Sequence, residues 1–170
     1  AALAMVASCA EVNRLLKAED LTAPDLKIGI GINKGICTVG NLGSDVRFDY
    51  SCVGDPVNLA ARLEGVTKKY GVNVVISLSV VEAMSHDRFE EFGLLIPLDR
   101  VIVVGKSEPV EIFTMLPHDT EWGALATECF QAVDQRDAAK LLIAEDRLSQ
   151  SEAPDQIKRL YQDRVKIQDF

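Results

Sequence analysis

Residues 47–64 read RFDYSCVGDPVNLAARLE, and this stretch decides the fold of the chain. The alternation of residues over 47–53 predicts a β-strand, and the Gly-Asp-Pro sequence after it predicts a turn. Helical spacing then predicts an amphipathic helix over 55–70, with Asp55 as its N-cap and Gly71 as its stop. A strand that leads through a tight turn into a helix is the local unit from which the rest of the chain can be placed.

Asn58 and Arg62 lie four residues apart in this unit, so an amide and a guanidinium share one face of the predicted helix. A guanidinium fits phosphate oxygens in a bidentate manner, and an amide can hydrogen-bond a sugar or phosphate oxygen beside it. The pair therefore suits an anionic ligand. From spacing alone, two polar residues on a solvated helix face remain the alternative interpretation.

Ahead of this unit, the sequence predicts one helix and two strands. Residues 1–18 are rich in Ala and Leu at helical spacing. Residues 26–32 and 35–41 are apolar and rich in β-branched side chains, and the Asn-Lys-Gly sequence between them predicts a hairpin.

Beyond the unit, the pattern changes character at Pro117. The elements predicted before it are a strand over 72–77, a helix over 79–85, and two strands over 101–104 and 110–116 that form a hairpin. The elements predicted after it are amphipathic helices over 121–133, 136–148 and 153–168. Small and apolar residues in the first two of these helices resemble a tetratricopeptide-like helical hairpin, namely Phe130, Ala132, Ala138, Ala139 and Leu142. One such unit is too few to identify a repeat.

Composition excludes several functional classes. The chain has 170 residues, 48% of them hydrophobic, which is enough for one domain with a core and an appendage. Its 18 basic and 26 acidic residues give a net charge of −8, which argues against nucleic acid or an acidic membrane surface as a partner. No apolar run approaches the roughly 20 residues of a membrane span. We therefore expect a cytoplasmic location, with a membrane-anchored parent left open.

The four cysteines are widely spaced, and none forms a C-x-x-C pair. This usage predicts buried, reduced thiols rather than a zinc site or a disulfide framework.

Three motifs in order resemble the second half of the catalytic domain of class III adenylyl/guanylyl cyclases: IGIGINKG over 28–35, VGNLGS over 39–44, and the stretch over 47–64. The similarity runs from about Ala1 to Pro117. It implies an α+β chain, in which a ferredoxin-like βαββαβ core that lacks its N-terminal part spans residues 1–117. A helical C-terminal extension then spans residues 118–170. The resemblance also implies a head-to-tail homodimer with active sites shared between subunits.

The resemblance assigns roles to three residues of the predicted site. Asn58 would orient the ribose, and Arg62 would stabilise charge on the transferring α-phosphate as the 3′-hydroxyl attacks. Lys106 lies in VGKSEP, over residues 104–109, where the family places a lysine that reaches the triphosphate. A solvated turn lysine is the alternative interpretation of Lys106.

Ser51 stands seven residues before Asn58, where the family places a base-selecting residue. Adenylyl cyclases usually have Asp or Thr there, and many guanylyl cyclases have Cys. A serine hydroxyl can donate or accept a hydrogen bond, so it could serve the adenine amino group as Thr would. This favours ATP and leaves GTP open, and a strand-end hydroxyl bonded to backbone is the non-functional alternative.

The family binds two Mg²⁺ or Mn²⁺ ions through two aspartates that lie upstream of its equivalent of the first helix, ahead of Ala1. Asp45, Asp49 and Asp55 are better explained as loop, pairing and helix-cap residues, so we assign no metal ligand in this chain. The resemblance therefore implies a fragment that does not turn over nucleotide alone.

The parent enzyme implied by these motifs is an adenylate cyclase that converts ATP to cyclic AMP and pyrophosphate. Two alternatives remain open: a non-catalytic cyclase-homology module used for regulation or dimerisation, and a guanylyl cyclase that uses GTP. A ferredoxin-like nucleic-acid binder is disfavoured by the acidic charge.

Overall fold

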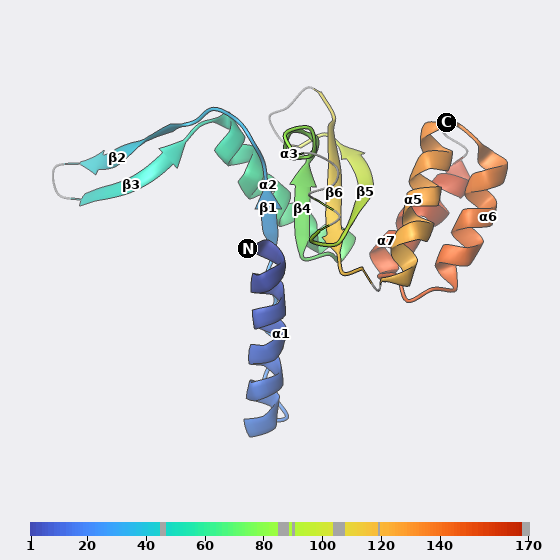
Figure 1. Ribbon diagram of the computed structural model, residues 1–170, viewed down its shortest axis with the longest axis horizontal. Coiled ribbons are helices and arrows are strands. Elements are labelled where there is room, and N and C mark those ends of the chain that lie inside the picture. The colour runs from blue at the N-terminus through green and yellow to red at the C-terminus, as the bar shows by residue number, and fades with distance from the viewer. Residues whose placement is uncertain (45–46, 85–88, 90, 104–107, 119, 168–170) are drawn as a thin grey trace.

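A four-stranded sheet lies at the centre of the computed structural model, which describes residues 1–44, 47–84, 89, 91–103, 108–118 and 120–167. Its strand order is β1-β4-β6-β5, and the strands are β1 (Ile30–Ile32), β4 (Val74–Ser77), β6 (Val110–Leu116) and β5 (Leu94–Val101). The β1–β4 pair is parallel, and the other two pairs are antiparallel. With helices on both faces, this is the mixed α+β architecture that the sequence predicts (Figure 1).

Two further strands form an arm that projects from the sheet (Figure 1). β2 (Thr38–Ser44) and β3 (Arg47–Val53) pair with each other antiparallel, with Thr38 opposite Val53. The predicted hairpin between residues 26–32 and 35–41 is therefore wrong. β1 instead pairs with the distant β4, because a strand pattern predicts which face is buried and does not identify the partner strand.

Helix α2 (Asp55–Tyr70) leads back from the arm and packs on one face of the sheet. It buries Leu59, Leu63, Thr67 and Tyr70 along one stripe. The predicted N-cap is wrong, since Gly54 occupies that position and Asp55 is the first helical residue. The predicted stop is confirmed, because Gly71 ends the helix with a φ of 66°, in the left-handed region that glycine adopts without strain.

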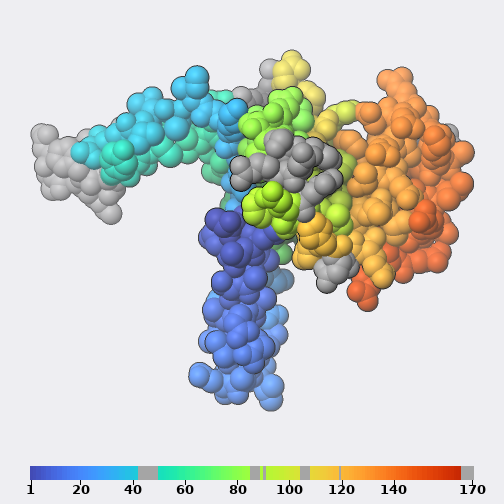
Figure 2. All heavy atoms as spheres, viewed as in Figure 1, coloured from blue at the N-terminus to red at the C-terminus, as the bar shows by residue number. Residues whose placement is uncertain are grey.

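On the opposite face of the sheet, the buried side chains of Val74, Ile76 and Phe113 pack against the start of α1 (Ala2–Glu19) and against α3 (Leu78–Val81). The structure describes α1 from end to end, and no side chain in it is fully buried. The helix projects away from the sheet (Figure 2). Its Met5, Val12 and Leu15 side chains are exposed.

Three C-terminal helices lie beside β5, and α5 packs directly against that strand (Figure 1). They are α5 (Glu121–Asp134), α6 (Ala138–Ser149) and α7 (Asp155–Ile167). Their buried side chains, among them Trp122 and Tyr161, join those of α2 and the sheet in one continuous hydrophobic core. Within the described residues, no helix combines the length and apolar character needed to cross a bilayer.

Two predicted elements are shifted in the structure. Of the described residues in the strand predicted over 101–104, only Val101 lies in a strand, at the end of β5, which begins at Leu94 and contains a register shift between Pro97 and Asp99. The helix predicted from Ser79 begins at Leu78, with Ser77 at its N-cap position. The hairpin between β5 and β6 is confirmed.

Candidate functional site

Asn58 and Arg62 lie on the first two turns of α2, directly beside the buried stripe that begins with Leu59 and Leu63. Asn58 is exposed and Arg62 is half-buried. Neither side chain forms a hydrogen bond or an ion pair with another part of the chain that the structure describes. The predicted shared face is therefore present, and both polar groups are free to bind a ligand from solvent.

Close packing fixes the position of this part of α2. A Cβ atom on Gly31 of β1 would lie 2.1 Å from the Ala60 carbonyl oxygen and 2.4 Å from the Glu64 nitrogen. Only glycine allows the strand to approach the helix backbone this closely. The glycine-rich motif before the arm thus has a packing role, because it seats the helix that carries Asn58 and Arg62.

Asn33, to which the sequence motifs give no role in the site, links three elements beside the start of α2. Its Oδ1 accepts hydrogen bonds from Ser77 Oγ (2.7 Å) and Ser79 Oγ (2.9 Å), and its amide donates to the Pro56 carbonyl. A polar residue between an apolar strand and a glycine was the only signal in the sequence. Its partners in β4 and α3 are distant in the chain, so the role emerges only from the fold.

Ser51 is exposed on β3 of the arm, where it pairs across the ladder with Gly40. No hydrogen bond joins Ser51 to Asn58 or Arg62 in the described part of the chain. Lys106 falls within 104–107, outside the described residues, so its predicted place near the triphosphate stays a prediction.

The described residues do not provide a metal site. They contain no group of three or more His, Cys, Asp or Glu side chains that could hold an ion. Asp55 begins α2, and Asp45 lies outside the described residues. The donor set around Asn58 and Arg62 therefore does not fit a pair of Mg²⁺ or Mn²⁺ ions, and we derive no catalytic step through a metal from this chain.

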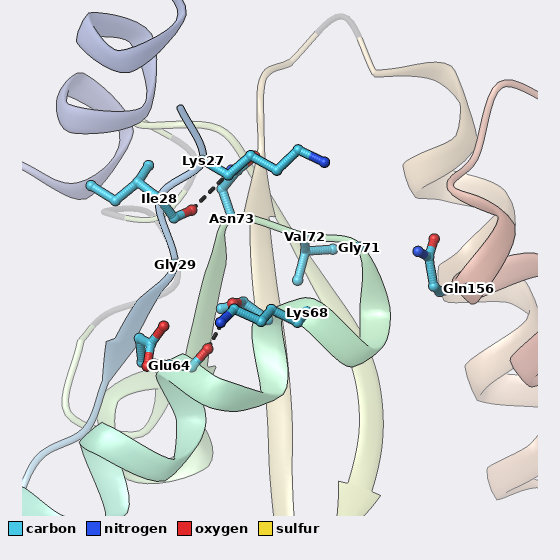
Figure 3. Close-up of a pocket in the computed structure, with 10 residues that line it drawn as sticks. Lys27, Ile28, Gly29, Glu64, Lys68, Gly71, Val72, Asn73 and Gln156 are labelled. Atoms are coloured by element: carbon cyan, nitrogen blue, oxygen red, sulfur yellow. Dashed lines mark hydrogen bonds between the residues drawn. The ribbon is translucent and has the colours of Figure 1, made fainter. Parts of the chain in front are cut away.

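A cavity of about 650 Å³ lies at the opposite end of α2, between the helix, the segment before β1 and the start of α7 (Figure 3). Lys27, Lys68 and Gln156 contribute to its lining, and Glu64 adds a carboxylate. The Asn73 amide donates to the Ile28 carbonyl (3.1 Å) at its rim. The cavity does not include Asn58 or Arg62, so it is separate from the predicted phosphate-binding face.

A buried polar cluster joins the C-terminal helices to the end of α2. The Tyr70 hydroxyl donates to Asp99 Oδ2 (2.6 Å), and the Arg164 guanidinium donates to Asp99 Oδ1. Burial, followed by the hydrogen bond to Asp99, raises the pKa of Tyr70 well above its usual range. The phenol therefore stays protonated and acts as a hydrogen-bond donor at every working pH.

Comparisons with known proteins agree with the motifs. The family model described as the adenylate and guanylate cyclase catalytic domain matches residues 1–115. An adenylate cyclase of Anabaena cylindrica is 41% identical over 90 residues, which are 53% of this chain and 18% of that protein. A terminal-differentiation-specific adenylate cyclase of Dictyostelium discoideum is 34% identical over 96 residues, or 56% of this chain and 4% of that protein.

Among solved structures, the adenylyl cyclase CyaB from P. aeruginosa superposes with a TM-score of 0.54 at 32% sequence identity. The match covers 67% of this chain and 54% of that one. The chain thus spans less than a fifth of the two curated relatives and about half of the solved one. Since the family model matches more than half of its length, the chain belongs to the family of adenylate and guanylate cyclase catalytic domains.

Proposed function

We propose that this chain supplies the nucleotide-orienting and charge-stabilising half of a nucleotidyl cyclase site that converts ATP to cyclic AMP and pyrophosphate. The observation that carries the proposal is the pair Asn58 and Arg62, which share an open face of α2 and have no partner among the described residues. Membership of the cyclase family supports the same reaction class.

In the proposed reaction, the ribose 3′-hydroxyl gives its proton to solvent water as its oxygen attacks the α-phosphorus. The bond from the α-phosphorus to the bridging β-phosphate oxygen breaks, and pyrophosphate leaves. The Arg62 guanidinium would stabilise the negative charge that develops on the α-phosphate oxygens, because its planar cationic group fits phosphate oxygens in a bidentate manner. The Asn58 amide would hold the ribose so that the hydroxyl lies in line with the bond that breaks. Both roles depend on the rigid placement of α2.

We propose that a second subunit completes this site and that the arm takes part in the contact. Val39, Tyr50 and Cys52 share one face of the β2–β3 ribbon, and 78% of Tyr50 is exposed. A two-stranded ribbon with an uncovered apolar face has little stability by itself in water. A homodimer in which the partner covers this face would bring the open face of α2 into a closed site.

ATP is the substrate that we propose. The Ser51 hydroxyl can accept a hydrogen bond from the adenine amino group, and its exposure on β3 leaves it accessible. The metal ions that the reaction needs would be held by carboxylates outside the described residues, in another segment or in the partner subunit.

A complementation assay tests the proposal. The chain is mixed with a class III cyclase subunit that has its metal-binding aspartates but carries alanine in place of its own asparagine and arginine. Cyclic AMP and cyclic GMP are then measured from ATP and GTP. We expect cyclic AMP only in the mixture, and a loss of about 100-fold or more when the chain carries Arg62→Ala.

The matched control is Arg147→Ala, which removes an exposed arginine that pairs with Glu128 on the C-terminal helices. This variant should keep the rate of the unsubstituted mixture. The proposal fails if sedimentation shows that the two chains associate and no cyclic nucleotide forms. Formation of cyclic GMP alone would replace ATP by GTP as the substrate.

A further inference from the structure

One buried carboxylate connects three separate elements of the molecule. Asp99 lies in β5 and is 7% exposed, Tyr70 is the last residue of α2 and is 1% exposed, and Arg164 comes from α7. The two hydrogen bonds that Asp99 accepts from Tyr70 and Arg164 therefore join the end of α2 to the sheet and to the last helix.

The cluster extends to the surface at one side. The Lys69 ammonium donates to the Tyr70 hydroxyl (3.1 Å) and lies 4.9 Å from the centre of the Tyr70 ring. The main-chain nitrogen of Arg100 also donates to Asp99 Oδ1 (2.8 Å). Asp99 is thus a well-satisfied buried charge, and removal of either side-chain partner would leave it without part of its compensation.

A second contact between α7 and α2 lies beside the cluster. A Cβ atom on Gly71 would lie 2.7 Å from Gln156 Oε1 and 3.2 Å from Pro154 Cβ, so the start of α7 sits against the end of α2. Gln156 faces the same cavity as Gly71 (Figure 3). The last helix therefore holds the C-terminal end of α2 at two points.

The other end of α2 carries the proposed site. Arg62 lies about two turns before Tyr70, which corresponds to about 12 Å along the helix axis. Between them, Leu63 and Thr67 are buried, so this part of the helix is packed on the core, and we expect it to move as one body. A change of tilt at Tyr70 would displace the side chains of Asn58 and Arg62.

We propose that Tyr70, Asp99 and Arg164 are positioning residues through which the C-terminal helices set the orientation of α2, and with it the placement of Asn58 and Arg62. The inference rests on the proposed function for its effect on catalysis. The mechanical part, from α7 to the start of α2, concerns this chain alone and can be measured without any enzyme activity.

The first measurement uses amide NMR spectra of the isolated chain with Arg164→Met and with the milder Tyr70→Phe, which keeps the ring. We expect the resonances of α2 to shift by more than a linewidth as far as Asn58 and Arg62. The matched control is Tyr161→Phe. Tyr161 is also 1% exposed, and its hydroxyl has no hydrogen-bond partner in the described structure. This control should leave the start of α2 unchanged, and Arg164→Lys should restore most of the original shifts.

The second measurement is the complementation assay. We expect Arg164→Met and Tyr70→Phe to lower kcat by about tenfold and to change KM for ATP by less than about twofold, because misplaced groups still bind substrate but stabilise the transition state poorly. Shifts confined to one turn around Tyr70 would overturn the inference. So would loss of activity that only tracks the fraction of unfolded protein. If the NMR shifts reach Arg62 and the unsubstituted mixture is inactive, the proposed function fails and the mechanical coupling stands.

Discussion

The side-chain amide of Asn33 donates a hydrogen bond of 3.0 Å to the main-chain carbonyl of Pro56. This bond ties the end of β1 to the first turn of α2, about 1.7 turns ahead of Arg62. The same side chain accepts two hydroxyl donors from Ser77 and Ser79, so all of its polar contacts depend on the orientation of its amide. The placement of the proposed site therefore depends on a residue that does not belong to it.

Asn33→Asp tests this link. A carboxylate would face the Pro56 carbonyl with an acceptor in place of a donor, so we expect the free energy of unfolding to fall by about 1–3 kcal/mol. Urea titration followed by circular dichroism measures the change. The control is Asn73→Asp, at an exposed position with one hydrogen bond to the Ile28 carbonyl, which should change stability by less than about 0.5 kcal/mol. Equal losses in both variants would contradict the special role of Asn33.

Gly31→Ala tests the close approach of β1 and α2. The added methyl group would overlap the Ala60 carbonyl oxygen at 2.1 Å, and backbone atoms cannot rotate out of the way. We expect the free energy of unfolding to fall by about 1–3 kcal/mol, which is the usual cost of an extra group in a well-packed core. Thermal unfolding measured by circular dichroism reports the loss.

Gly65→Ala is the matched control, at a position of α2 that faces away from β1. No atom lies within 4 Å of the position that its Cβ would occupy. Alanine is a better helix former than glycine, so this variant should gain up to about 1 kcal/mol. A destabilised Gly65→Ala or a neutral Gly31→Ala would show that the described packing is wrong.

The four cysteines should separate into accessible and protected thiols. The prediction that they are all buried is wrong, since Cys37, just before the arm, and Cys52, on the arm, are exposed and only Cys129 is fully buried. Burial raises the pKa of the Cys129 thiol to about 12, so at pH 8 its thiolate fraction is on the order of one in ten thousand.

Iodoacetamide at pH 8, followed by peptide mass spectrometry, should modify Cys37 and Cys52 at least about 100-fold faster than Cys129. In 8 M urea the difference should disappear, because the unfolded chain exposes every thiol. Rapid modification of Cys129 in the folded chain would contradict the packing of α5 against the sheet.

The parts of the fold that the sequence predicts correctly depend on local signals. The alternation of residues over 47–53 predicts β3. The turn that contains Pro56 predicts the start of α2, and Gly71 predicts its end. β5 was largely missed, because Pro97 and the charged pair Asp99 and Arg100 interrupt its apolar pattern. The two side-chain partners of Asp99 come from α2 and α7, and no local pattern reports contacts between such distant segments.

The site shows the same division between local and distant information. The shared face of Asn58 and Arg62 follows from helical spacing and was predicted. The supporting contacts of Gly31 and Asn33 depend on how β1 meets α2. In the sequence alone these two residues are equally typical of a turn, because glycine and asparagine are both common there. Spacing also does not reveal that the face is open on its outer side, which is the basis for proposing a second subunit.

The last prediction concerns the choice of purine by Ser51. Adenine presents an amino donor where guanine presents a carbonyl acceptor, and an ionised carboxylate can only accept hydrogen bonds. The complementation assay is therefore run with ATP and GTP in competition. Ser51→Asp should raise the ratio of cyclic AMP to cyclic GMP by at least about tenfold, because the guanine carbonyl would face the carboxylate without a hydrogen-bond donor. Ser51→Thr keeps the hydroxyl and should leave the ratio unchanged. The control is Thr38→Val, two pairs along the ribbon and on the same face as Ser51. If the ratio stays within about twofold in Ser51→Asp, this hydroxyl does not contact the base, and selection must come from residues outside the arm.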